Sequence, residues 1–300
     1  MNLSAIEYSF RSGGFGILIM EISMLLHTGR PLICHVPTAD HPLIALKQIW
    51  RIGDDRMQIL VEDRGWHPAS NDMIKAFSPY YRPDSVELFG RTYATGRTGK
   101  RSIGLAMHAY GLGDDLPTKR SPYCKYATRE IYNQILAVCD RAGYDVLTIN
   151  QPGMSVEHKA FLLNEYCDCL IGYEGGVAHL AHTLSVPCII LPWQYDGDGN
   201  RLTDPADEIR LIAHSYHMDL RSYFPATQEE ITEWNPDQLR ACIDRLYQLQ
   251  GNNRYYRPGV FVDPEKLMFY GQVHNDPFST GELWQTREFI RQYNPDIRLY

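Results

Sequence analysis

Residues 168–193 of this 300-residue chain read DCLIGYEGGVAHLAHTLSVPCIILPW, and this stretch decides the fold. The apolar runs at 169–172 and 188–191 each predict a short buried strand. Between them, apolar side chains recur at intervals of three and four residues, which predicts a helix over 176–184. Pro187 then forces the chain into an extended conformation before the second strand. Strand, glycine turn, helix and strand together make one βαβ unit.

A pair of glycines lies where the first of these strands turns into the helix. Gly175 and Gly176 have no side chains, so a ligand can come close to the backbone there. The first N–H groups of a helix have no partner within it, and the helix dipole favours an anion at this end. Glu174 cannot attract a phosphate, so we expect its carboxylate to accept hydrogen bonds from sugar hydroxyls. A phosphate beside a sugar is the chemistry of a sugar nucleotide.

The same stretch resembles the C-terminal signature of the heptosyltransferase-like glycosyltransferases, family nine, which have the GT-B fold. That signature has an acidic residue, Thr or Gly, Gly, two residues and His, then Leu-Ala-x-x-Leu-x-x-Pro and an apolar strand. Here Glu174 replaces the more usual Asp, and Gly175 replaces the Thr. The matching positions are Gly176, His179, Leu180, Ala181, Leu184 and Pro187. The alternative is an ordinary strand-to-helix turn whose helix only packs against a core.

This resemblance implies an α/β protein with two doubly wound, Rossmann-type domains and a cleft between them. The second domain would bind a nucleoside-diphosphate sugar, and the first would bind the acceptor. We expect an acceptor-side domain at 1–97 and a nucleotide-sugar domain at 98–250. Residues 251–300 would be an extension, since family members often end in a helix that crosses back to the first domain. The signature residues expected to bind the donor are Glu174, Gly175, Gly176, Val177 and His179.

Composition and charge limit the classes of protein that remain. With 44% hydrophobic and 22% charged residues, the chain has the composition of a soluble globular protein. No apolar run approaches the roughly 18 residues that span a bilayer, and no signal peptide is evident. Seven scattered cysteines without zinc-type pairs fit a reduced compartment, so we expect a cytoplasmic protein. The formal net charge of −7 argues against a general nucleic-acid binder.

Both halves of the chain alternate strand and helix patterns, which is typical of α/β folds. In the first half we expect strands at 6–10, 31–36, 57–61 and 85–93, and helices at 15–27 and 39–50. Residues 94–100 contain two glycines among polar neighbours and make the best linker. In the second half we expect further strands at 102–108 and 145–149, and helices at 128–142, 156–167, 237–249 and 281–292.

A second glycine loop, RSGGFG at 11–16, lies between the first predicted strand and helix. It resembles the N-terminal glycine loop of the same family, so Gly13 and Gly14 are candidates for donor contact. In the family this loop leads to an Asp that is the usual candidate for the general base, but here Ile17 stands in its place. Glu21 lies one turn further along the same helix face and is our candidate replacement. The alternative is that Glu21 caps the helix or pairs with a nearby Arg.

A basic loop, GLGDDLPTKRSP at 111–122, follows the first predicted strand of the second half. Related enzymes place a Lys-x-Trp-Pro or Arg-Trp-Pro segment here, directed at the donor phosphates. Lys119, Arg120 and Pro122 match that segment, while Ser121 replaces the Trp. Cationic side chains there would stabilise the charge that grows on a departing diphosphate. The alternative is a solvated pair of surface charges.

Two more residues beside this loop are candidate site residues. His108 ends the preceding predicted strand and would contact the donor. Asp114 would orient the acceptor or supply the base if Glu21 does not. The alternative for Asp114 is that it only forms a turn.

Metal binding is not expected. His179 and His182 have a helical spacing that metals can use, but no third ligand is in sight. Residues 196–200 resemble the opening of a calcium loop, yet the twelfth position is Asp207 and not the required Glu. We therefore expect His179 to contact the donor, and no cofactor beyond the nucleotide sugar as co-substrate.

The sequence thus predicts a metal-independent glycosyltransferase that moves a sugar from a nucleoside-diphosphate sugar to an acceptor hydroxyl. A saccharide is the expected acceptor; a modified nucleic-acid base or a protein side chain is the alternative. A non-catalytic sugar-nucleotide-binding protein, or another nucleotide-sugar enzyme such as an epimerase, also fits the pattern. The donor nucleotide, its sugar and the inverting or retaining outcome stay open.

Overall fold

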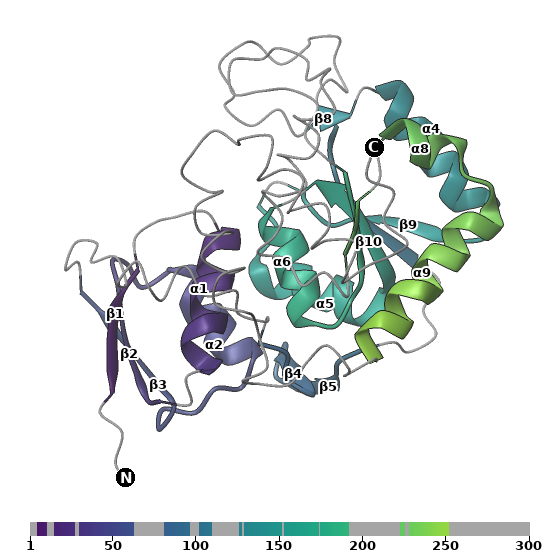
Figure 1. Cartoon of the computed structure of the whole chain (residues 1–300). Helices are drawn as coiled ribbons and strands as arrows, with labels where there is room; N and C mark the ends of the chain where they lie inside the picture. Colours follow the sequence, from purple (N-terminus) through teal and green to yellow (C-terminus); the bar gives the residue numbers. More distant parts are fainter. Residues whose placement is uncertain are drawn as a thin grey trace, which may run out of the picture.

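The computed structural model describes residues 5–10, 15–27, 30–62, 81–96, 102–109, 126–127, 129–151, 153–173, 175–191, 223–225 and 228–251. Within this part of the chain, strands and helices alternate in both halves (Figure 1), as expected for the α/β class. No described helix combines the length and apolarity needed to cross a membrane.

The first half builds a three-stranded parallel sheet in the order β1-β2-β3. Its strands are β1 (Ile6–Ser9), β2 (Leu32–Val36) and β3 (Met57–Val61), and its helices are α1 (Phe15–His27) and α2 (Pro42–Ile49). Tyr8 and Cys34 pair in register and are both buried, so β1 and β2 turn the same apolar face to the helices. The predicted strands and the bounds of α1 are confirmed.

Helix α2 is shorter than the predicted 39–50, because it begins at Pro42. Proline is favoured at the first helical position, whereas the residue before a proline is disfavoured in a helical conformation. His41 is accordingly extended, with φ −61° and ψ 134°, and its Nδ1 accepts a hydrogen bond from the Leu43 N–H at 3.3 Å. Trp50 caps the helix, and Arg51 follows with a left-handed φ of 56°.

The single strand predicted at 85–93 is wrong. The structure has a hairpin of β4 (Ser85–Leu88) and β5 (Arg91–Ala94). Phe89 and Gly90 form its two-residue turn with φ of 50° and 69°. Two successive positive φ angles belong to a type I′ turn, whose twist matches that of the antiparallel strands. Gly90 suits this turn, but Phe89 is an unusual residue for it and conceals the turn in the sequence.

The second half builds a five-stranded parallel sheet in the order β12-β11-β10-β6-β9. Its strands are β6 (Ser102–Ala106), β9 (Asp145–Thr148), β10 (Cys167–Tyr173), β11 (Cys188–Leu191) and β12 (Tyr223–Pro225). Its helices are α4 (Arg129–Arg141), α5 (Val156–Tyr166), α6 (Gly176–Thr183), α8 (Gln228–Glu233) and α9 (Pro236–Gly251). A short parallel pair, β7 (His108–Ala109) and β8 (Tyr126–Ala127), follows β6. The predicted βαβ unit at 168–193 is confirmed, while the helix predicted at 281–292 lies outside the described residues.

The described elements form five layers (Figure 1). The β1–β3 sheet is followed by α1 and α2, then by α5 and α6, then by the five-stranded sheet, and finally by α4, α8 and α9. One apolar cluster joins the first sheet, the four middle helices and one face of the second sheet. A second cluster fills the space between the other face of that sheet and α4, α8 and α9.

The second sheet is therefore covered by helices on both faces, which is the doubly wound arrangement. In the described part of the first half, α1 and α2 both lie on one face of the sheet, so the doubly wound prediction does not extend to it. The middle helices of the two halves pack directly on each other, α1 on α6 and α2 on α5. The predicted cleft and the domain limits at 97 and 250 stay predictions.

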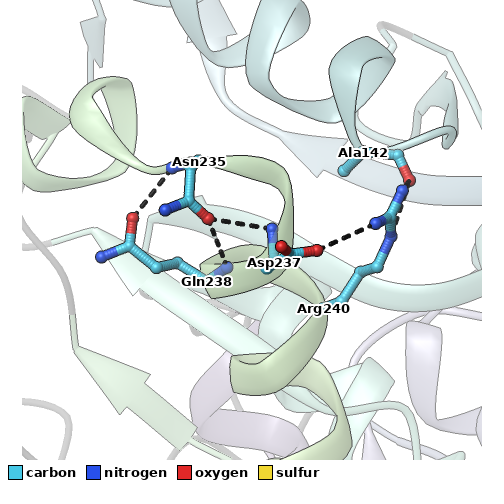
Figure 2. Close-up of polar contacts among 5 residues, drawn as sticks. All are labelled: Ala142, Asn235, Asp237, Gln238 and Arg240. Atoms are coloured by element: carbon cyan, nitrogen blue, oxygen red, sulfur yellow. Dashed lines mark hydrogen bonds and ion pairs between the residues drawn. The ribbon is translucent and has the colours of Figure 1, made fainter.

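The start of α9 shows how local sequence anchors an outer helix (Figure 2). Asn235 Oδ1 accepts hydrogen bonds from the N–H groups of Asp237 and Gln238, both at 3.0 Å. Gln238 Oε1 accepts from the Asn235 N–H at 2.9 Å, which completes a reciprocal cap. One turn later, the Arg240 Nε and Nη2 atoms donate to the Ala142 carbonyl oxygen at 3.1 and 2.8 Å. These bonds tie α9 to the end of α4.

Candidate functional site

The strand order of the second sheet creates a switch point between β6 and β10. Counted across the sheet from β9 to β12, the strands are the second, first, third, fourth and fifth of this sheet in chain order. The first and third, β6 and β10, are therefore neighbours. The helix after β6, α4, lies on one face, whereas the helix after β10, α6, lies on the other. Ligands of open α/β sheets bind at such a point, outside the carboxyl ends of the strands. The described residues of the signature, which start at Gly175, follow the carboxyl end of β10 at this switch point.

The two strands approach each other closely at this edge. A Cβ built on Gly172 would lie 2.7 Å from the Ala106 carbonyl oxygen, so only glycine fits there without movement. Met107 and His108 continue the chain beyond β6, and Tyr173 ends β10. The backbone of His108 therefore lies at the same edge of the sheet as the start of the signature helix.

Helix α6 begins at this edge with Gly175 as its N-cap. Gly175 has no side chain with which to cap the helix, and its carbonyl oxygen accepts the first helical hydrogen bond, from the His179 N–H at 3.1 Å. The dipole of the helix places partial positive charge at its first turn. Such an end is suited to an anion, and phosphate groups are frequent ligands of it.

The start of α1 packs directly on the start of α6. A Cβ built on Gly176 would lie 2.6 Å from Phe15 Cδ1, and one built on Gly16 would lie 2.4 Å from His179 Cδ2 and 2.9 Å from His179 Nε2. Each glycine therefore makes room for a ring from the other helix. The starts of two helices, one from each half of the chain, meet at one place, and the positive ends of two helix dipoles converge there.

This packing gives two predicted site residues an additional structural role. His179 is 1% exposed, and its ring lies against the backbone of Gly16. The open side of Gly176, which we expected to admit a ligand, is filled by Phe15. Donor contact by any of these residues stays a prediction.

The structure brings together those predicted site residues that it describes. Gly175, Gly176, Val177 and His179 form the first turn of α6, and the backbone of His108 lies at the same sheet edge. Glu21 belongs to α1, but its side chain is outside the described set. The predicted site residues that lie outside the described residues altogether are Gly13, Gly14, Asp114, Lys119, Arg120 and Glu174.

Sequence reasoning missed two residues that shape the site. Phe15 and Gly16 lie at the end of the glycine loop at 11–16, and only the tertiary contact with α6 reveals what they do. The sequence shows a glycine and an aromatic residue at the very start of a helix. Their role in packing is recognised only from the position of α6 opposite them.

Other chemistries at this place are limited by the described residues. Burial raises the pKa of the Cys169 and Cys188 thiols on β10 and β11 well above the ordinary value, so neither is a thiolate nucleophile at neutral pH. Among the described side chains, no group of three or more His, Cys, Asp or Glu residues is arranged to hold a metal ion. Anion binding is the chemistry that the described geometry favours.

In sequence comparisons, no protein-family model and no curated protein matches this chain. Among solved structures it is similar to TibC, a bacterial iron-containing dodecameric glycosyltransferase from enterotoxigenic E. coli. The TM-score is 0.41 and the identity 12%, over 66% of this chain and 62% of that chain. TibC described as a heptosyltransferase in complex with ADP-D-beta-D-heptose gives a TM-score of 0.37 and 11% identity, over 67% and 62% of the two chains. This chain thus spans about 62% of the length of the solved chains that it resembles.

Proposed function

We propose that this protein is a metal-independent glycosyltransferase that uses a nucleoside-diphosphate sugar. One observation carries the proposal: the first turns of α1 and α6 meet beside the switch point between β6 and β10. A diphosphate is a doubly anionic group, and two converging helix N-termini favour anions. The signature at 174–187, with its acidic residue beside the glycines, supplies the reason to expect a sugar next to that diphosphate.

The reaction would be attack of an acceptor hydroxyl on the anomeric carbon of the donor sugar. The bond from that carbon to the diphosphate oxygen breaks, and the nucleoside diphosphate leaves. In this proposal the first turn of α6 holds the phosphates, and Lys119 and Arg120 stabilise the charge on the leaving group. Glu174 accepts hydrogen bonds from the sugar. Glu21 or Asp114 takes the proton of the acceptor hydroxyl.

The proposal assigns acceptor binding and donor binding to different halves of the chain. The first half of the chain would bind the acceptor, most simply a saccharide, while the second half binds the donor. The net charge of −7 disfavours a nucleic-acid base as the acceptor. It does not bear on a protein side chain as the acceptor. The acceptor is therefore best identified by experiment after the donor is known.

The test is a panel of UDP-, GDP-, ADP-, CDP- and dTDP-linked sugars, scored first by the shift in melting temperature. The donor with the largest shift is then offered with saccharide acceptors, and released nucleoside diphosphate is measured. Lys119→Ala and Arg120→Ala should each weaken donor binding or turnover by roughly 10- to 100-fold, as expected for charge-assisted phosphate contacts. Arg91→Ala, an exposed cation on β5, is the matched control and should have no effect. Equal behaviour of all three variants would show that 119 and 120 are surface charges.

A second candidate is a non-catalytic sugar-nucleotide-binding protein. Ile17 favours it, because the family's usual base is missing at that position. Glu21→Gln separates the two candidates, since a true base should lose about 10²–10⁴-fold in rate with little change in donor affinity. Tight donor binding without release of nucleoside diphosphate, with any acceptor offered to the unmodified protein, would favour the binding protein over the enzyme.

A further inference from the structure

The ring of Phe15 lies against the start of α6, although it comes from the half of the chain that we assign to the acceptor. Helices α1 and α6 pack side by side (Figure 1). A Cβ built on Gly176 would lie 2.6 Å from Phe15 Cδ1, 3.0 Å from Phe15 Cβ and 3.2 Å from Phe15 Cγ. An apolar group thus borders the turn whose N–H groups we assign to the donor phosphates.

The backbones of the two helices fix this contact. Phe15 is the first residue of α1, and rotation of its ring about χ1 leaves its Cβ 3.0 Å from the Cβ position on Gly176. The next residue, Gly16, is buried, and a Cβ on it would lie 2.9 Å from His179 Nε2 and 3.4 Å from the Gly176 nitrogen. The start of α1 therefore cannot leave α6 without breaking this packing. Phe15 is a wall of the candidate site and not a gate.

This wall is poorly suited to hold or activate a water molecule. Residues 15–18, the first turn of α1, read FGIL, so no side chain of the turn can accept a proton. Phe15 packs against the apolar cluster that includes the buried Leu18 and Ala178. A buried water needs about two to four polar partners, and attack by water on a sugar donor also needs a group that takes its proton. The side chains of this turn supply neither.

We propose that Phe15 shields the bound donor from water and thereby reserves its sugar for the acceptor; this inference rests on the proposed function. In the competing hydrolysis, a water oxygen attacks the anomeric carbon and the bond to the diphosphate oxygen breaks. Free sugar and nucleoside diphosphate form, and one water proton passes to the solvent. The ring takes up space beside the phosphate-binding turn that water would otherwise fill. Exclusion of water also strengthens the hydrogen bonds from the N–H groups to the phosphates.

The test measures hydrolysis of the donor with no acceptor present. The full chain is titrated with UDP-, GDP-, ADP-, CDP- and dTDP-linked sugars, and release of free sugar and nucleoside diphosphate is measured with the bound donor at saturation. The parent should hydrolyse the donor slowly. Phe15→Ala removes the ring and should hydrolyse the saturating donor about tenfold faster or more. Phe15→Leu keeps an apolar side chain at this position and should stay close to the parent.

Gly16→Ala is the second variant, because its methyl group pushes α1 away from α6 and leaves the Phe15 ring in the chain. It should also accelerate hydrolysis. Leu26→Ala is the matched control: it removes a buried apolar side chain from the last turn of α1, so it should lower stability without changing the hydrolysis rate.

Two results would overturn the inference, and they are distinguishable. If Phe15→Ala and Gly16→Ala bind the donor and hydrolyse it at the parental rate, Phe15 is only a packing residue, and the glycosyltransferase proposal stands. If the parent binds no donor of the panel, the shield and the proposed function both fall.

Discussion

Gly16→Ala probes the contact on which the candidate site depends. Gly16 is the second residue of α1, and the Cβ of an alanine there would lie 2.4 Å from His179 Cδ2 and 2.9 Å from His179 Nε2. Contacts between heavy atoms begin to repel well before this distance, so the ring or the helix must move. His179 is 1% exposed, so its ring has no open space into which to turn. The substitution should therefore destabilise the junction between the two halves.

Two effects of opposite sign set the magnitude. Overpacking a filled site costs about 1–3 kcal/mol, because neighbours leave their preferred rotamers or the backbone shifts. Alanine is a better helix former than glycine by up to about 1 kcal/mol. The packing cost outweighs the gain in helix propensity, and we expect a net loss of about 1–2 kcal/mol in the free energy of unfolding. Without the clash, the same substitution would stabilise the protein, so even the sign is informative.

Urea unfolding followed by circular dichroism measures this loss, and a double-mutant cycle isolates its cause. His179→Ala removes the ring and leaves room for the new methyl group, so Gly16→Ala should cost much less in that background. The coupling between the two substitutions should be about 1 kcal/mol or more, as for residues in contact. Gly53→Ala is the matched control, since its Cβ would also lie 2.4 Å from a neighbour, but that neighbour is the carboxylate of the exposed Asp55. Additive effects of the Gly16 and His179 substitutions would refute the packing of α1 on α6.

Three further predictions concern stability. Burial raises the pKa of the Cys34 and Cys139 thiols from 9.0 to about 12, so both stay protonated in the folded protein while the unfolded thiols ionise. The contribution of these two thiols to the unfolding free energy should consequently be constant below pH 9. Between pH 9 and 12 it should fall by up to about 1.4 kcal/mol per pH unit for each thiol; if Cys139→Ala does not flatten this fall, its thiol is not the cause. Asn235→Ala should lower the unfolding free energy by about 1 kcal/mol through loss of the α9 cap, and an unchanged urea midpoint would show that the cap is dispensable. Gly90→Ala should cost about 1–2 kcal/mol because φ is 69° at the hairpin turn, and hydrogen exchange of β4 and β5 should accelerate; no change in either would mean that the turn tolerates a side chain.

Local patterns predicted most described elements, because each is dictated by short-range physics. The bounds of α1 and β11 were predicted to the residue. The first is an apolar-rich segment, interrupted by Glu21, that follows a glycine loop, and the second is an apolar run between two prolines. The start of α2 was missed because Pro42 was not used as the first helical residue. The hairpin turn was missed because Phe89 occupies a left-handed position that normally takes Asn, Asp or Gly.

The candidate site was predictable only in part. The glycine turn before α6 is a local feature, and residues 174–187 contain all of its signal. The contacts of Phe15 with Gly176 and of Gly16 with His179 join segments about 160 residues apart, and no local pattern reports such a contact. The adjacency of β6 and β10 is likewise a property of the sheet order. Sequence therefore indicated two candidate loops, and the fold showed that the helix starts that follow them, at Phe15 and Gly176, meet.

Hydrogen exchange in the presence of a nucleotide sugar tests the central claim most directly. The donor that gives the largest melting-temperature shift is added at saturation, and amide exchange is followed peptide by peptide. The first N–H groups of α6, at 176–178, have no earlier turn to bond to and should become protected together with those at the start of α1, at 15–16. Protection at both helix starts is the predicted result. Protection at neither of them, in a protein that demonstrably binds the donor, would place the donor elsewhere and contradict the account.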